Sequence, residues 1–261
     1  MNNLKNIDSK VREILNSNQL YYEMLEQWHD LKGGLAVEPE VRSFIEAACE
    51  PGARVLEAGA GSGSITNWFA ARYKDTHFLG VDISRIGVAI ARKKAPANAS
   101  FQVGDLKTLP LKDQAFHFAF AQSVLEHVVG WEDAVADLYR VLMPNGKLLL
   151  RLENGGVQNV SRQRALLNYL LGQNHNDIES PSFELKNGNW TDHEHNFDVN
   201  QIPSDLLLKA LRRVGFGISY FSTGTSHWRN SKNRGARVVS FLEFWPFNHL
   251  GRISIVLAAK P

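Results

Sequence analysis

The sequence predicts an α/β fold, a Rossmann-like doubly wound sheet whose strands are mostly parallel. Two observations lead to this fold class. Between residues 53 and 153, apolar runs of strand length alternate with amphipathic runs of helix length, the pattern of strand–helix–strand units. A glycine-rich turn, "GAGSGS" at 59–64, joins the first strand-like run to the first helix-like run. Such a turn lets backbone approach a ligand closely at the N-terminus of a helix.

The N-terminal part, residues 1–50, is expected to form a helical cap on this sheet. Apolar residues recur there at helical spacing, and the proline–glycine pair at 51–52 is a helix stop. The sheet domain is therefore expected to occupy residues 51–261.

Five strands and three helices are expected in the alternating part. The strand-like runs are 53–59, 77–82, 100–105, 115–122 and 146–153. The helix-like runs between them are 64–73, 84–95 and 131–142.

The regular alternation stops after the fifth strand. Residues 154–202 are rich in Asn, Gly, Ser and His, and we expect a substrate-side insertion that acts as a lid. A capped helix at 204–214 then leads into a strand, and "RISIVLAAKP" provides a final strand at 252–259.

Composition narrows the class of protein. The 29 basic and 27 acidic residues give a net charge of +2, which is no electrostatic footprint for nucleic acid. The single cysteine, Cys49, excludes an intrachain disulfide and a cysteine-rich metal site. We expect neither a secretory signal nor a membrane-spanning segment, because no apolar run of the required length occurs in the sequence. We therefore expect a soluble, cytoplasmic protein, monomeric or homodimeric.

The glycine turn alone leaves two cofactors open. A dinucleotide fingerprint needs a third glycine where Ser64 stands, although small residues also occur there. Glu57, two residues before Gly59, is an unusual neighbour for a pyrophosphate and suits a cationic ligand. The turn therefore favours S-adenosylmethionine over NAD without deciding between them.

Two further acids stand where strands end. Asp82 ends the second strand, where a carboxylate accepts both ribose hydroxyls, a need that both cofactors share. Asp105 ends the third strand, placed to meet an adenine amino group, with Leu106 beside it to cover the ring.

The motifs "VLEAGAGSGS", "GVDIS", "GDLKTLPL", "AQSVLEHV" and "LYRVLMPNGKLLL" together resemble those of the class I S-adenosylmethionine-dependent methyltransferases, in order and spacing, over about residues 53–153. The resemblance implies a seven-stranded sheet with an antiparallel last strand, and it places Gln122 beside the sulfonium. The expected cofactor-binding residues are Glu57, Gly59, Ala60, Gly61, Gly63, Asp82, Ile83, Asp105, Leu106 and Gln122.

A candidate general base lies in the insertion, in "NWTDHEHNFD". His193 and His195 face one way in an extended segment, and Asp192 is placed to orient one of them. The alternatives are a polar surface loop without a catalytic role and, with His175, a metal site; no metal is expected.

The stretch from "LENGGVQNVSRQRALLNYLLG" to "LLLKALRRVGF" is similar to methyltransferases encoded among glycan and polysaccharide genes. This resemblance implies a hydroxyl acceptor on a small molecule or saccharide. An N- or carboxyl-directed methyltransferase, an NAD-dependent oxidoreductase and a non-catalytic cofactor-binding module are the alternatives.

Residues 227–247 combine basic side chains with aromatic ones. A peripheral contact with a lipid surface would use such residues, but a plug beneath a loop or a dimer interface explains them better.

Overall fold

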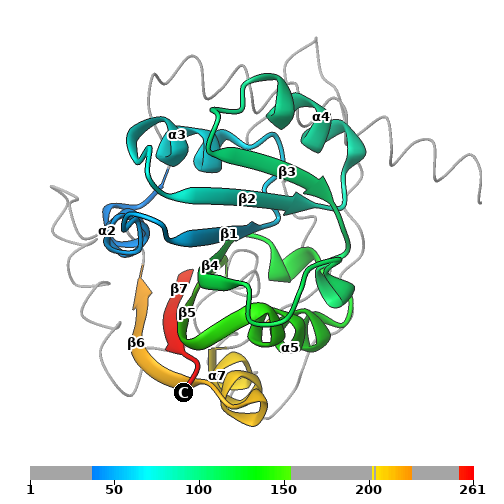
Figure 1. Cartoon of the computed structure of the whole chain (residues 1–261). Helices are drawn as coiled ribbons and strands as arrows, with labels where there is room; N and C mark the ends of the chain where they lie inside the picture. Colours follow the sequence, from blue (N-terminus) through cyan, green and yellow to red (C-terminus); the bar gives the residue numbers. More distant parts are fainter. Residues whose placement is uncertain (1–36, 154–201, 203, 225–252) are drawn as a thin grey trace, which may run out of the picture.

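The computed structural model describes residues 37–153, 202, 204–224 and 253–261. Within them lies one seven-stranded sheet in the order β3-β2-β1-β4-β5-β7-β6 (Figure 1). Strands β1 to β5 are parallel, and β7 is antiparallel to both of its neighbours. The α/β class, the seven strands and the antiparallel last strand are thereby confirmed.

The strands follow the predicted runs closely. Their bounds are β1 (Arg54–Ala58), β2 (His77–Asp82), β3 (Ala99–Val103), β4 (Phe116–Gln122), β5 (Leu142–Glu153), β6 (Gly217–Gly224) and β7 (Ile253–Ala259).

The helices also lie where helical periodicity predicts them. Their bounds are α2 (Pro39–Ala47), α3 (Ser64–Arg72), α4 (Arg85–Lys93), α5 (Trp131–Val141) and α7 (Ser204–Val214). Two short 3-10 turns, η1 (Leu106–Thr108) and η2 (Leu125–His127), were not predicted. A three-residue turn is too short to show the periodicity on which such a prediction depends.

Strand β5 begins earlier than residue 146, where the prediction placed it. It pairs with β4 from Leu142, across an irregular register between Phe116 and Phe118. Asn145 has a φ of 65° there. The turn-like sequence "PNG" within this strand led the prediction to start it four residues too late.

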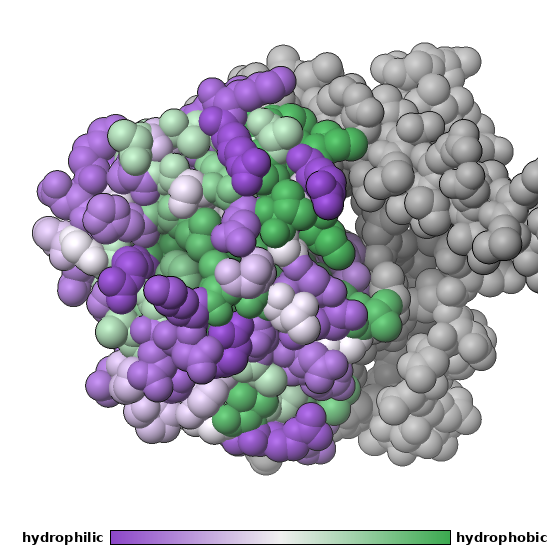
Figure 2. Space-filling model, turned by 45° about the vertical axis from the view of Figure 1, so that its right-hand side comes forward, coloured by the Kyte–Doolittle hydropathy of each residue, from purple (hydrophilic) through white to green (hydrophobic). Residues whose placement is uncertain are grey.

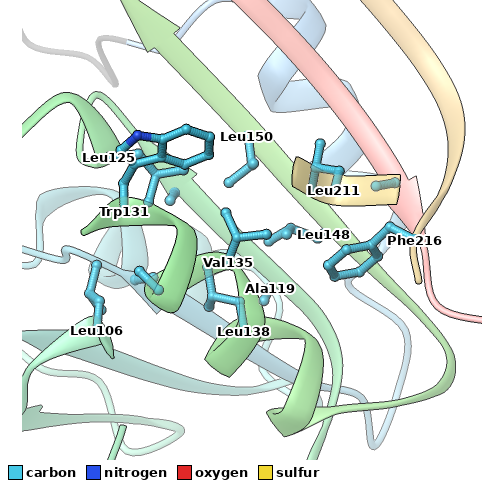
Figure 3. Packing of buried hydrophobic residues seen from close by; sticks show 14 of the residues in the cluster. Leu106, Ala119, Leu125, Trp131, Val135, Leu138, Leu148, Leu150, Leu211 and Phe216 are labelled. Atoms are coloured by element: carbon cyan, nitrogen blue, oxygen red, sulfur yellow. The ribbon is translucent and has the colours of Figure 1, made fainter. Parts of the chain in front are cut away.

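Alternation along the strands divides the core between the two faces of the sheet. In β4, Ala119 and Ala121 face the larger cluster while Phe118 and Phe120 face the other, as the period of two requires. Helices α5 and α7 cover the first face. Figure 3 shows α5 packed over the sheet, with Leu138 and Val135 directed towards strand residues such as Leu148.

Helices α2 and α3 cover the opposite face. Val41 and Ile45 of α2 are buried against Val55 and Phe69. The helix that the sequence placed in the N-terminal cap thus packs in the core of the sheet domain. Residues 1–36, the insertion at 154–201 and the basic–aromatic stretch at 227–247 lie outside the described residues.

Candidate cofactor site

The expected cofactor residues meet at one edge of the sheet. Gly59 follows β1, Asp82 ends β2, Asp105 stands two residues after β3, and Gln122 ends β4. Because these four strands are parallel neighbours, their carboxyl ends lie side by side, where open α/β sheets bind ligands. In Figure 1 the arrowheads of β1, β2 and β3 point to this side. Figure 2 turns the right-hand side of the molecule forward, and hydrophobic and hydrophilic residues are mixed on the face that it shows.

The glycine turn requires glycine for its own backbone. Gly59, Gly61 and Gly63 have φ values of 79°, 51° and 76°, a region that disfavours other residues. A Cβ on Gly59 would lie 2.4 Å from a methyl carbon of Val124, and one on Gly63 would lie 2.6 Å from Ala91 Cβ. The left-handed backbone conformation of all three residues, and the close packing at Gly59 and Gly63, thus explain the glycines without any ligand.

Asp82 joins the end of β2 to this turn. Its carboxylate accepts hydrogen bonds from the backbone N–H of Gly61 and of Ser84, each at 2.8 Å. The side chain is buried. Ser84 in turn caps α4 by accepting the N–H of Gly87. Asp82 therefore fixes the turn on one side and the start of α4 on the other.

Glu57 acts on helix α3 from within β1. Its Oε2 accepts the backbone N–H of Thr66 at 3.0 Å and the Thr66 hydroxyl, which supplies a cap that Gly63 at the N-cap position lacks. Burial raises the pKa of Glu57 to about 8, with a smaller contribution from nearby Asp82, against the Thr66 hydrogen bonds. The carboxyl is therefore mostly protonated at neutral pH, and in that form it carries no charge. The expected attraction of Glu57 for a cationic ligand requires its ionised form and stays a prediction.

Asp105 is partly exposed to solvent, whereas the next residue, Leu106, is buried. Asp105 caps η1 by accepting the N–H of Lys107 at 2.9 Å, and 41% of its side-chain surface is exposed. Leu106 is buried in the core. Ile83, directly after Asp82, is 72% exposed, so it offers an apolar surface to a planar base more readily than Leu106 does.

A charged network that the sequence analysis missed lies beside Gln122. Arg151 of β5 pairs with Gln122 across the two strands. Its guanidinium donates to Oε1 of Glu38 at 3.0 and 2.8 Å and to the hydroxyl of Ser123. The signal was an arginine within the apolar run "LLLRL" at 148–152.

The proposed catalytic residues belong to the insertion after β5. Asp192, His193, His195 and His175 all lie outside the described residues. Within the described part of the chain, no group of three or more His, Cys, Asp or Glu side chains could hold a metal ion. No helix in that part is long and apolar enough to cross a membrane.

The described surface also has an open hollow of about 660 Å³ between η1 and α5. It shares only Asp105 with the expected site. Its lining residues are Asp105, Lys107, Thr108, Asp133, Ala136, Asp137 and Arg140.

Comparison with known proteins agrees with the fold. Residues 56–150 match the family described as "Methyltransferase domain". The chain is 34% identical over 104 residues to the O-methyltransferase cnsE of Penicillium expansum, covering 38% of this chain and 37% of that protein. It is 30% identical over 114 residues to a ubiquinone/menaquinone biosynthesis C-methyltransferase of Dinoroseobacter shibae, covering 40% and 46%.

Among solved structures, an S-adenosylmethionine-dependent methyltransferase from Methanosarcina mazei superposes with a TM-score of 0.59 at 20% identity. The match covers 87% of this chain and 99% of that one. The chain spans less than half the length of the two curated relatives above. Residues 56–150 thus match a methyltransferase-domain family, and the described part of the chain has the fold of class I S-adenosylmethionine-dependent methyltransferases.

The strand-end residues fit this cofactor in chemistry. Asp82 would hold the ribose hydroxyls, and Asp105 with Ile83 would hold the adenine. The N-terminus of α3, where Gly63 offers no side-chain cap, would favour the carboxylate of the methionine part.

Proposed function

We propose that the protein transfers a methyl group from S-adenosylmethionine to a hydroxyl of a small molecule or saccharide. The single observation that carries the cofactor is the alignment of Asp82 and Asp105 at neighbouring strand ends beside the glycine turn. The hydroxyl acceptor is supported by the sequence resemblance to glycan methyltransferases.

The chemistry asks for alignment more than for covalent participation. S-adenosylmethionine supplies a methyl group already activated by its sulfonium, and transfer is an in-line displacement. The protein's residues bind and orient: Asp82 and Asp105 fix the nucleoside end, and Gln122 lies beside the reacting end. A hydroxyl acceptor also needs a base for its proton, and His193 or His195, oriented by Asp192, is the candidate.

The relatives differ in the atom that they methylate. One is named an O-methyltransferase and the other a C-methyltransferase. The names of the relatives thus do not fix the accepting atom in this chain. Analysis of the methylated product separates the proposed hydroxyl acceptor from the N- and carboxyl-directed alternatives. The NAD alternative is disfavoured, because dinucleotide-binding sheets have the order 3-2-1-4-5-6, whereas β7 here lies antiparallel between β5 and β6.

Binding of S-adenosylhomocysteine tests the cofactor. Because Asp82 is expected to accept two ribose hydroxyls, Asp82→Ala should weaken binding by about 100-fold in calorimetry. Asp82→Asn, which keeps one acceptor for the glycine turn, should weaken it less. Asp75→Ala, an exposed acid before β2, is the control and should bind like the wild type. Wild-type protein that ignores S-adenosylhomocysteine but is stabilised by NADH would overturn the proposal.

Substitution of the two histidines tests the base. If one of them removes the acceptor's proton, replacing it by Ala should lower turnover by about 100-fold or more and leave S-adenosylhomocysteine affinity nearly unchanged. The assay is transfer of labelled methyl to extract fractions. Wild-type activity in both single variants would discard the histidine base, and tight binding without any transfer would indicate a non-catalytic module.

A further inference from the structure

Arg140 of α5 holds residues 109–113, which follow Asp105, the residue expected to bind adenine. Its Nε donates to Asp137 Oδ1 at 2.6 Å, and one terminal nitrogen donates to the Leu111 carbonyl at 2.8 Å and to Asp113 at 2.6 Å. The other terminal nitrogen donates to the Leu109 carbonyl at 3.0 Å and to Asp137 Oδ2 at 2.9 Å. All five N–H donors of the guanidinium have partners in this arrangement.

Asp137 completes the contact from the same helix. Its Oδ2 accepts the backbone N–H of Leu109 at 2.6 Å, so that residue is held at both its N–H and its carbonyl. The carbonyl of Arg140 accepts the N–H of Gln114 at 3.0 Å. The two acids raise the pKa of the guanidinium above its ordinary value, so Arg140 keeps its charge at any pH at which the protein folds.

This segment determines where Asp105 lies. Asp105 caps η1, which runs directly into Leu109, and Leu106 and Leu109 are buried in the same core cluster. A Cβ on Gly104 would lie 2.9 Å from the ring of Pro110, so the chain folds back tightly on itself here. A shift of residues 109–113 would therefore move η1 and the Asp105 carboxylate that caps it.

We propose that Arg140 and Asp137 are positioning residues for adenine: they fix residues 109–113 on α5 and thereby aim Asp105 at the 6-amino group. The inference rests on the proposed S-adenosylmethionine site. Asp137 is the main partner, because its side chain is 14% exposed whereas that of Asp113 is 70% exposed and screened by solvent.

The ratio of two affinities separates this role from general stability. S-adenosylhomocysteine offers an amino donor to Asp105, while S-inosyl-L-homocysteine presents a carbonyl oxygen at the same position. Wild-type protein should prefer the first by about 30-fold or more, since the mismatch leaves a carboxylate facing an acceptor. Arg140→Gln and Asp137→Asn should reduce that preference to about threefold, because each removes several of these hydrogen bonds.

Three further variants sharpen the test. Arg140→Lys should not restore the ratio, because an ammonium cannot replace the planar fork. Asp113→Asn should keep it. Lys260→Met is the matched control: Lys260 donates to the carbonyls of Tyr139 and Leu142 at the end of the same helix, each at 2.8 Å, without touching residues 109–113. It should lower the melting temperature and leave the ratio unchanged.

Several results would overturn the inference. A wild-type ratio in folded Arg140→Gln or Asp137→Asn would do so, as would loss of the ratio in Lys260→Met. Wild-type protein that binds S-adenosylhomocysteine and S-inosyl-L-homocysteine equally well would show that Asp105 does not contact the 6-amino group. That result would also overturn the inference. Failure of the wild type to bind S-adenosylhomocysteine is a different result, which overturns the proposed function itself.

Discussion

At the scale of single residues, the acid in front of the glycines has a structural role that its sequence position does not reveal. Glu57 was predicted as a neighbour of the ligand, and its neighbour in the structure is Thr66 in the first turn of α3. Both roles are compatible with one side chain, because a carboxyl group has two oxygens and Thr66 uses Oε2. The structural role alone explains why an acid or amide is needed at this position.

Glu57 should make the stability of the protein pH-dependent. Its pKa is about 8 in the folded protein and near 4.5 when unfolded, so the folded state binds the extra proton between these values. Stability should therefore fall as the pH rises from about 5 to 8. Glu57→Gln keeps an acceptor for Thr66 but cannot ionise, so its advantage over the wild type should grow across that range.

Melting temperatures of the two proteins between pH 5 and 9 check this expectation. Glu50→Gln, at an exposed acid before β1, is the control and should follow the wild-type curve. Parallel curves for wild type and Glu57→Gln would show that the carboxyl titrates normally.

At the scale of elements, the turn between β1 and α3 gives a matched pair of glycines. Gly59 and Gly52 both have a φ of 79°, but a Cβ on Gly52 meets nothing within 4 Å while one on Gly59 meets Val124. Gly52→Ala should therefore cost about 1 kcal/mol of backbone strain. Gly59→Ala should cost about 3 kcal/mol, because overpacking adds to the same strain.

Chemical denaturation measures both costs, and Val124→Ala provides the rescue. In the Val124→Ala background, Gly59→Ala should cost only slightly more than Gly52→Ala does, because the two methyl carbons are gone and only the Cβ at position 124 lies close, at 3.1 Å. Equal costs for the two glycines in the wild-type background would mean that Val124 moves aside freely and that packing does not select this glycine.

At the scale of the whole molecule, the sequence predicted local features and missed distant ones. The strands and helices were predictable because their periodicity is local. The positions of Asp82 and Asp105 at or just after strand ends were predictable because each lies in one short motif, and their role in cofactor binding stays a prediction. Glu38 and Arg151 were missed because 113 positions separate them, and no local pattern pairs them. The partners of Arg140, 27 to 31 positions away in its loop contacts, were hidden for the same reason.

The Glu38–Arg151 pair connects the start of α2 to the edge of the sheet that carries the cofactor residues. The side chains are 16% and 8% exposed, so solvent screens the pair weakly. Substituting either residue removes this ion pair from a weakly screened position. Glu38→Gln or Arg151→Met alone should therefore lower the free energy of unfolding by about 3 kcal/mol.

A double-mutant cycle in urea separates this coupling from the loss of single side chains. The double variant should be less destabilised than the sum of the single variants, because the same ion pair is then lost only once. The exposed pair Arg42–Glu46, at 2.8 Å on α2, is the control, and Glu46→Gln there should change stability by less than about 0.5 kcal/mol. Additive single effects at Glu38 and Arg151 would mean that each side chain stabilises the protein through separate contacts. In that case the ion pair would not be what joins α2 to this edge of the sheet.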